Sequence, residues 1–353
     1  MAHGGERTSE KSRWACALGV VALAFVSFAS LLWGTAALGT REALQTLALL
    51  ASGGTADATA TLVLLSVRLP RVLEGVCCGA ALACSGLLLQ ASLDNDLASP
   101  GVMGVNSGAG LLWLVAALWL PGHPVLRQAM AFVGALLATL LVYLVSRRAG
   151  TSRGTVVLAG VAVSSLMSAA IDAIVVVWPE SVTDRVSFTL GGLSGVTYQS
   201  LALCVPALLV ALAAGAYLGR GVDLLALGDE AAHGLGLDVR SCRLGTIACA
   251  ALLAASAVSV CGLLSFVGLI VPNLVRMWAR PTTRQGLALC ALWGAALLVA
   301  CDLVARTIAF PYELPVGLVL ALLGAPFFMA LLARRGRNHG SHSVAAGRGG
   351  ETA

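Results

Sequence analysis

Lysine is almost absent from this chain of 353 residues. Of its 22 basic residues, 21 are arginines and one is Lys11. A phosphate-binding loop of the GxxxxGKS or GxxxxGKT kind needs a lysine next to its glycines, and Lys11 has no such neighbours. The sequence therefore excludes a P-loop ATPase within this chain.

Charged residues are scarce as well. They make up 11% of the chain, against 58% hydrophobic residues and a mean hydropathy of +0.91. Soluble domains average about 25% charged and about 45–50% apolar residues. The composition indicates an all-α polytopic membrane protein. The net charge of +5 does not indicate a nucleic-acid partner, because the basic residues are spread over the loops between apolar runs.

Neither histidine nor cysteine forms a recognisable site. The five histidines are scattered, and no CxxC pair has a histidine nearby. The ten cysteines lie mostly in or beside apolar runs, where a free thiol packs as a small apolar group. We therefore predict no metal site, no disulfide framework and no cofactor. We also predict no catalytic residue, because no acid–base pair or Ser–His pair lies within an apolar run.

Ten apolar runs are long enough to cross a membrane, which takes about 20 residues of helix. They lie near residues 14–34, 70–92, 100–120, 125–146, 154–178, 198–219, 244–261, 263–278, 286–309 and 314–333. The seventh and eighth share an uncharged stretch of 32 residues, 244–275. We predict a full helix and then a short or broken one, with a bend at Gly262 and a distortion at Pro272. A single long tilted helix is the alternative.

The basic residues of the loops predict the orientation. With the N-terminus in the cytoplasm, sixteen of them fall on the cytoplasmic side and six on the outer side, in agreement with the positive-inside rule. We therefore expect both termini in the cytoplasm. Residues 1–13 would form an N-terminal segment, 14–336 a single transmembrane domain with a retained first helix, and the polar residues 337–353 a disordered tail.

One charged stretch interrupts the apolar pattern between the sixth and seventh runs. It reads LGDEAAHGLGLDVRSCR and covers residues 227–243. Asp229 and Glu230 suit the first turn of a helix, and Gly234 and Gly236 then break it. We expect one or two short helices, at about 228–243, lying across the cytoplasmic face. Composition alone allows either a solvated loop or a rigid contact element for a soluble partner.

Four stretches resemble the permease family of ABC importers for iron-siderophore complexes, haem and cobalamin, the FecCD/BtuC type. They are RLPRVLEGVCCGAALACSGLLLQASLDNDLASPGVMGVNSGAG (68–110), LALGDEAAHGLGLDVRSCR (225–243), GLLSFVGLIVPNLVR (262–276) and CDLVARTIAFPYELPVGLVLALLGAPFFMALLARRG (301–336). They occur in the family order and at the family spacing. The chain departs from the family pattern at Asp96, where proline is usual, at Asn273, where histidine is common, and at Leu320, where threonine is frequent.

The resemblance implies a BtuC-like permease with ten spans that pairs with a second permease, identical or different, in the bacterial inner membrane. Two cytoplasmic ATPase subunits and an outer substrate-binding protein complete such an importer. A ferric siderophore is its most common substrate, and haem and cobalamin stay open. The charged stretch would then dock on the ATPase and transmit its closure to the helices. The residues concerned are Asp229, Glu230, Ala231, His233, Gly234, Gly236, Leu237, Arg240 and Arg243.

The resemblance also assigns roles at the two faces of the membrane. Three outer arginines, Arg68, Arg71 and Arg306, would meet carboxylates of the binding protein, which a planar guanidinium holds well. Simple anchoring of helix ends is the alternative for the first two. The helix breaks would lie near the gate, and the stretch LASPGVMGVNSGAG (97–110) is placed at its cytoplasmic side. These breaks are Pro100, Gly101, Gly104, Gly262 and Pro272.

Three acidic residues fall inside or at the margin of the spans, where an unpaired charge is costly. We expect structural roles for them: Asp302 paired with Arg306 one turn away, and Glu74 paired with Arg71. Asp172 would face either the pathway or a neighbouring helix. An ion-coupled secondary transporter is the main alternative function, with Asp172 as its coupling acid. An intramembrane enzyme is a weaker alternative.

Overall fold

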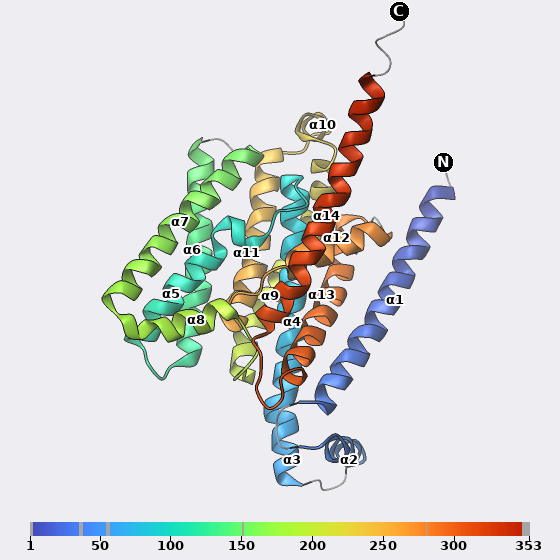
Figure 1. The fold of residues 1–353 in the computed structure, drawn as a ribbon. Helices are drawn as coiled ribbons and strands as arrows, with labels where there is room; N and C mark the ends of the chain where they lie inside the picture. Colours follow the sequence, from blue (N-terminus) through green and yellow to red (C-terminus); the bar gives the residue numbers. More distant parts are fainter. Residues whose placement is uncertain (1–2, 35–37, 54–56, 150–151, 280, 348–353) are drawn as a thin grey trace, which may run out of the picture.

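All regular secondary structure is helical over residues 3–34, 38–53, 57–149, 152–279 and 281–347, which the computed structural model describes. Side chains are described from residue 11 to 333, apart from those gaps and residues 102 and 332. Most long helices run side by side along one direction, and short helices join them at both ends (Figure 1). Within this part of the chain there is no strand.

Ten apolar helices form the body of the molecule. The long ones are α1 (His3–Leu32), α4 (Leu69–Leu93), α6 (Pro124–Ala149), α7 (Arg153–Val177), α9 (Tyr198–Leu225), α11 (Val239–Cys261) and α13 (Thr283–Thr307). The other three are α5 (Val105–Trp119), α12 (Val267–Ala279) and α14 (Val316–Gly347). By length and composition seven described helices can span a membrane, and α5, α12 and α14 contribute shorter apolar stretches. All ten coincide with predicted runs, so the prediction of an all-α protein with about ten spans is confirmed.

Short elements connect these helices. They are α2 (Thr40–Ala51), α3 (Ala58–Leu62), η1 (Val63–Arg68), η2 (Pro100–Met103), η3 (Pro179–Ser181), α8 (Val182–Leu190) and α10 (Asp229–Gly234). Both α3 and the π-helical turn η1 run directly into α4, so that one apolar helical stretch covers 36 residues. The hydropathy pattern did not predict α2 or α8, because neither is long enough to span a membrane.

The break between the seventh and eighth spans follows from backbone geometry. α11 ends at Cys261, and Gly262 has φ +68°, where a Cβ would lie 2.6 Å from the carbonyl oxygen of Phe188. α12 then begins at Val267 and contains Pro272, which cannot donate a backbone hydrogen bond. The prediction of two elements separated at Gly262 is confirmed, and the single tilted helix is wrong.

Helix α4 forms the centre of the core, and α9, α11, α12 and α13 pack around it. Two glycines permit the closest crossings. A Cβ on Gly79 would lie 2.3 Å from the carbonyl oxygen of Gly294, and a Cβ on Gly86 would lie 1.8 Å from that of Gly268. Small residues allow helix backbones to approach this closely inside a membrane. Gly79 and Gly86 therefore serve packing between helices of this chain.

The ends of the chain agree with an even number of crossings. Both termini and α10 lie at one end of the helix bundle, while α2, α3 and α8 lie at the opposite end (Figure 1). We call these the α10 end and the α2 end. The predicted disordered tail, 337–353, overlaps the last part of α14, whose side chains are not described, and residues 348–353, which lie outside the described part of the chain.

Candidate functional site

The charged stretch forms a short helix and the beginning of a long one. α10 starts after Gly228, which has φ +100°, and it is followed by Gly236 with φ +84°. Asp238 then caps α11: its carboxylate accepts hydrogen bonds from the backbone N–H of Ser241 at 3.2 Å and from the hydroxyl at 2.6 Å. The prediction of one or two short helices is confirmed for α10, while the second turn belongs to α11.

Helix α10 packs against the rest of the chain through a small apolar cluster. Ala232 is fully buried, together with Leu225 of α9 and Cys242 of α11. Two leucines that flank α10 are exposed: Leu227 is 62% and Leu235 is 63% accessible. Exposed leucines beside a short, well-anchored helix are typical of a contact surface for another protein.

Ion pairs anchor the N-terminus of α10 to three other helices. Arg243 of α11 donates to the Asp229 carboxylate at 2.6 Å and to the backbone oxygen of Ser92, near the end of α4, at 3.2 Å. Arg153, the first residue of α7, bridges Asp229 at 3.4 Å and Asp94 at 2.6 Å. We call these residues the anchor network. These contacts join α10 to the ends of α4, α7 and α11.

The charges of this network persist at neutral pH. The hydrogen bond from Arg243 lowers the pKa of Asp229 below its ordinary value. A carboxyl group with a lowered pKa contributes stability above its ordinary pKa and loses it as the pH falls through the lowered one. The Asp229–Arg243 pair is therefore fully formed throughout the neutral range.

One predicted coupling residue has a different role from the one expected. Arg243 is only 2% exposed, so it does not offer its guanidinium to an external subunit. The other predicted residues divide by exposure. Glu230, Ala231, His233, Gly234, Gly236 and Arg240 are exposed, Asp229 is exposed beside its arginine partners, and Leu237 is half-buried against the apolar cluster.

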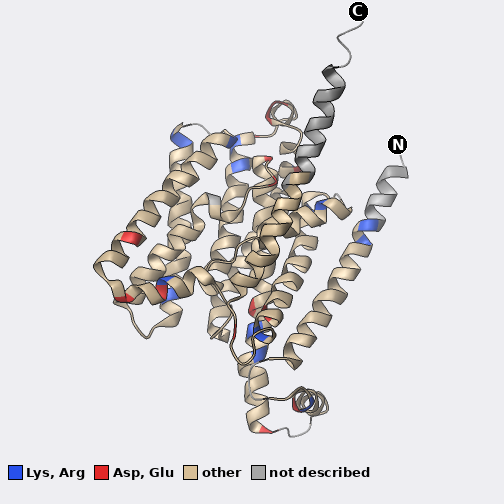
Figure 2. Ribbon diagram, viewed as in Figure 1, with Lys and Arg blue, Asp and Glu red and all other residues tan. Residues whose placement is uncertain are grey.

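The three arginines expected to meet an outer protein lie together at the α2 end, but they are buried. Arg68, Arg71 and Arg306 are 2%, 8% and 3% exposed. Figure 2 shows basic and acidic residues side by side near this end of the bundle. Burying a guanidinium requires internal partners, and each of the three has them. Their placement therefore contradicts a direct role in docking.

The partners of these arginines come from distant parts of the chain. Arg71 binds Asp302 through two of its nitrogens, at 2.9 and 3.0 Å, and Glu313 at 2.9 Å. Arg306 binds the other oxygen of Asp302 at 3.0 Å, which confirms the predicted Asp302–Arg306 pair. Arg68 instead donates to three backbone oxygens, those of Leu31, Leu32 and Leu38, at 2.7–3.0 Å.

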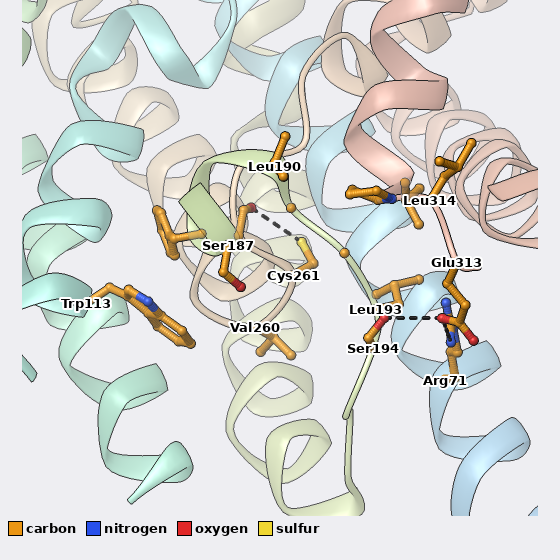
Figure 3. A pocket seen from close by; sticks show the side chains of 16 residues that line it. Arg71, Trp113, Ser187, Leu190, Leu193, Ser194, Val260, Cys261, Glu313 and Leu314 are labelled. Carbon is orange, nitrogen blue, oxygen red and sulfur yellow. Dashed lines mark hydrogen bonds and ion pairs between the residues drawn. The ribbon is translucent and has the colours of Figure 1, made fainter. Parts of the chain in front are cut away.

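An open cavity of about 280 Å³ lies next to this cluster. The loop that joins α8 to α9 and the loop before α14 form its wall, with Trp113 and Phe188 on the side of α5 and α8. Glu313 joins the two loops by bonding both Arg71 and Ser194 (Figure 3). The stretch LGGLS (190–194) lines this cavity.

The predicted helix breaks lie in two places. Pro100 and Gly101 form η2, and Gly104, with φ +76°, opens α5. This segment follows Asp94, so it lies towards the α10 end. Gly262 instead lines the cavity beside the buried arginines, and Pro272 is buried in α12.

The model of the FecCD transport family matches residues 22–334 of this sequence. The chain belongs to the FecCD transport family. It is 38% identical over 277 residues to the Fe(3+)-citrate import system permease YfmD of Bacillus subtilis (78% of this chain, 83% of the relative). It is also 40% identical over 279 residues to the cobalamin import system permease BtuC of Halobacterium salinarum (78% and 75%). The hemin permease HmuU of Yersinia pestis is 37% identical over 277 residues (77% and 83%).

A solved structure has the same fold as this FecCD chain. It is described as an inward-facing conformation of a metal-chelate type ABC transporter, and it superposes with a TM-score of 0.78 at 27% identity. The match covers 90% of this chain and 98% of that one. The chain is therefore a membrane-spanning transport permease.

Two of its departures from the FecCD pattern contact each other. The side chain of Asn273 donates to the backbone oxygen of Asp96 at 3.2 Å, and Arg276 bonds the Asp96 carboxylate at 3.1 Å. Residues that lie far apart in the sequence thus join the segment before η2 to α12. The third departure, Leu320, is simply buried.

Two of the acidic side chains in the spans have partners other than those expected from the sequence. Glu74 does not pair with Arg71, because Arg71 faces Asp302 while Glu74 faces α9 and α11. Asp172 pairs with Arg185 at 2.8 Å, and both side chains are about half exposed. Sequence reasoning missed Arg153 and Asp94 as parts of the anchor network, since Arg153 was weighed only as a loop charge.

Proposed function

We propose that this chain is the permease of an ATP-driven importer that carries a whole metal chelate into a bacterial cell. The observation that carries the proposal is α10, a short exposed helix fixed to the ends of three spans by the anchor network. A separate ATPase subunit that grips α10 would move those spans as a unit. No nucleotide, metal or other cofactor is required on this chain itself.

The substrate we propose is a ferric chelate, with ferric siderophores as the first choice. The relatives' names support the class, since they include permeases for Fe(3+)-citrate, hemin and cobalamin. In all three, the metal is held by an organic ligand. A permease for such ligands has no need to bind the free ion, and selection then rests mainly on an outer substrate-binding protein.

The assembly we propose contains two permeases, two ATPase subunits and one binding protein, in the inner membrane, with both termini in the cytoplasm. Helices α7 and α14 carry apolar residues that are largely exposed, which suits contact with lipid or a second permease. The buried arginines at the α2 end would stabilise the face on which the binding protein rests. Direct contacts would then come from exposed neighbours such as Phe310 and Tyr312.

Ion-coupled transport is not supported by the acid that it would need. Asp172 forms an ion pair with Arg185 at 2.8 Å, and both side chains are about half exposed, so its charge already has a partner within the chain. ATP-driven transport remains the better proposal.

Gly236→Val is expected to lower ATP-dependent uptake at least about tenfold without reducing membrane insertion. A β-branched residue at φ +84° is strained, so the turn that positions α10 against α11 must distort. The matched control is Gly234→Ala, which enters open space at the end of α10 and should transport normally. Uptake would be measured in proteoliposomes with the partner ATPase. Equal uptake by the two variants would contradict the coupling role of α10.

A further inference from the structure

A buried cluster of one carboxylate and two thiols lies between α4, α9 and α11. Glu74 and Cys78 belong to α4, and Cys204 belongs to α9. One ligand atom from each of the three lies within 4.8 Å of the other two, and all three residues are buried. Over the described part of the chain, no other group of three His, Cys, Asp or Glu residues is arranged in this way.

The carboxylate of this cluster is incompletely satisfied. Glu74 is fully buried; its Oε1 accepts a hydrogen bond from the Cys78 thiol at 3.3 Å, while Oε2 has no hydrogen-bond partner. A buried oxygen without a partner costs free energy, because water has been removed and nothing replaces it. A bound cation would give this carboxylate oxygen the partner that it lacks.

We propose that Glu74, Cys78 and Cys204 bind a thiophilic divalent cation of the zinc or cadmium type. Thiolates select soft or borderline metals, and a carboxylate completes such a ligand set. Zinc lies about 2.0–2.3 Å from its ligands, which places neighbouring donors roughly 3.5–4 Å apart. The three donor atoms lie within 4.8 Å of one another, which is at most about 1 Å beyond this range.

A third thiol lies close to the cluster on α11. Cys261 lies next to Cys78, and both thiols point towards the backbone oxygen of Ala257. Cys261 also lines the outer cavity (Figure 3). An ion in that cavity would reach Cys261 first and then pass to the buried cluster.

Binding replaces protons by the metal. Each thiol that becomes a ligand releases one proton, and Glu74 releases another if it was protonated. Because the ligands come from different helices, the bound ion would link α4 to α9. The proposal is independent of the transported substrate, which we expect to enter as an intact chelate.

Cadmium titration of the purified full-length chain tests the site. Under reducing, oxygen-free conditions we expect one high-affinity Cd²⁺ per chain, seen by the ultraviolet band of Cd–thiolate bonds, with proton release and a raised melting temperature. Cys78→Ala, Cys204→Ala and Glu74→Gln should each weaken binding at least about tenfold. The isosteric Glu74→Gln change keeps the volume of the side chain, so that a loss of binding is separable from a loss of folding.

The matched control is the double variant Cys84→Ala and Cys290→Ala. These two thiols are equally buried and close to each other, between α4 and α13, but no carboxylate lies beside them. Cadmium affinity should be unchanged in this variant. Binding that survives in Cys78→Ala/Cys204→Ala, or that falls equally in the control, would overturn the proposal.

Discussion

Replacing Asp302 with alanine is expected to lower the free energy of unfolding by about 3–5 kcal/mol, because two buried guanidiniums then lose the carboxylate between them. Asp302 is 1% exposed and accepts from Arg71 and Arg306 on its two oxygens. Thermal and denaturant unfolding of the purified chain in detergent would measure the change. In addition, the loop before α14 should loosen, since Arg71 also holds Glu313.

The matched control for Asp302→Ala is Asp172→Ala. Asp172 also pairs with an arginine, Arg185, but the two side chains are 60% and 42% exposed. Exposed ion pairs contribute about 0–1 kcal/mol, so this variant should unfold almost as the natural chain does. If both variants were equally stable, the buried arginines at the α2 end would not depend on Asp302.

Replacing Arg243 with alanine is expected to lower ATP-driven uptake at least about tenfold, while the chain still inserts into the membrane and folds. The change removes both the ion pair to Asp229 and the bond to the backbone oxygen of Ser92. Helix α10 would then move under the ATPase without carrying α4 with it. Uptake and ATP hydrolysis would be measured together in proteoliposomes. We expect ATP hydrolysis to continue while uptake stops.

Arg240→Ala provides the comparison for Arg243→Ala. Arg240 lies three residues earlier, is exposed, and donates only to the backbone oxygen of Arg147. We expect uptake to fall much less than in Arg243→Ala, because the hydrogen bond from Arg240 to Arg147 does not join α10 to α4. A variant of Arg243 that transports normally would show that the anchor network does not transmit the motion.

The hydropathy of the sequence was sufficient to predict the membrane spans, because a membrane helix appears in the sequence as a continuous apolar run. The break at Gly262 was predictable for the same reason: 32 uncharged residues are too many for one crossing and too few for two regular ones. The helices α2 and α8 were not predicted, because short helices do not appear as long continuous apolar runs. The charged stretch at 228–243 correctly predicted a short helix, which is α10.

The pairing of charges could not be read from the sequence. Arg71 finds Asp302, 231 residues away, rather than Glu74 on the adjacent turn. Local spacing predicted the wrong partner because α4 turns Arg71 towards α13 and Glu74 towards α9 and α11. The same limit applies to Arg153, whose partners lie on two other segments. Only the three-dimensional arrangement distinguishes an arginine that meets another protein from one that holds the chain together.

The most direct measurement is uptake of a radiolabelled ferric chelate by proteoliposomes that contain this chain, with its ATPase and binding protein added one at a time. The account predicts uptake only when all components and ATP are present, and none in response to a proton or sodium gradient. Uptake by this chain alone, driven by an ion gradient without ATP, would contradict it.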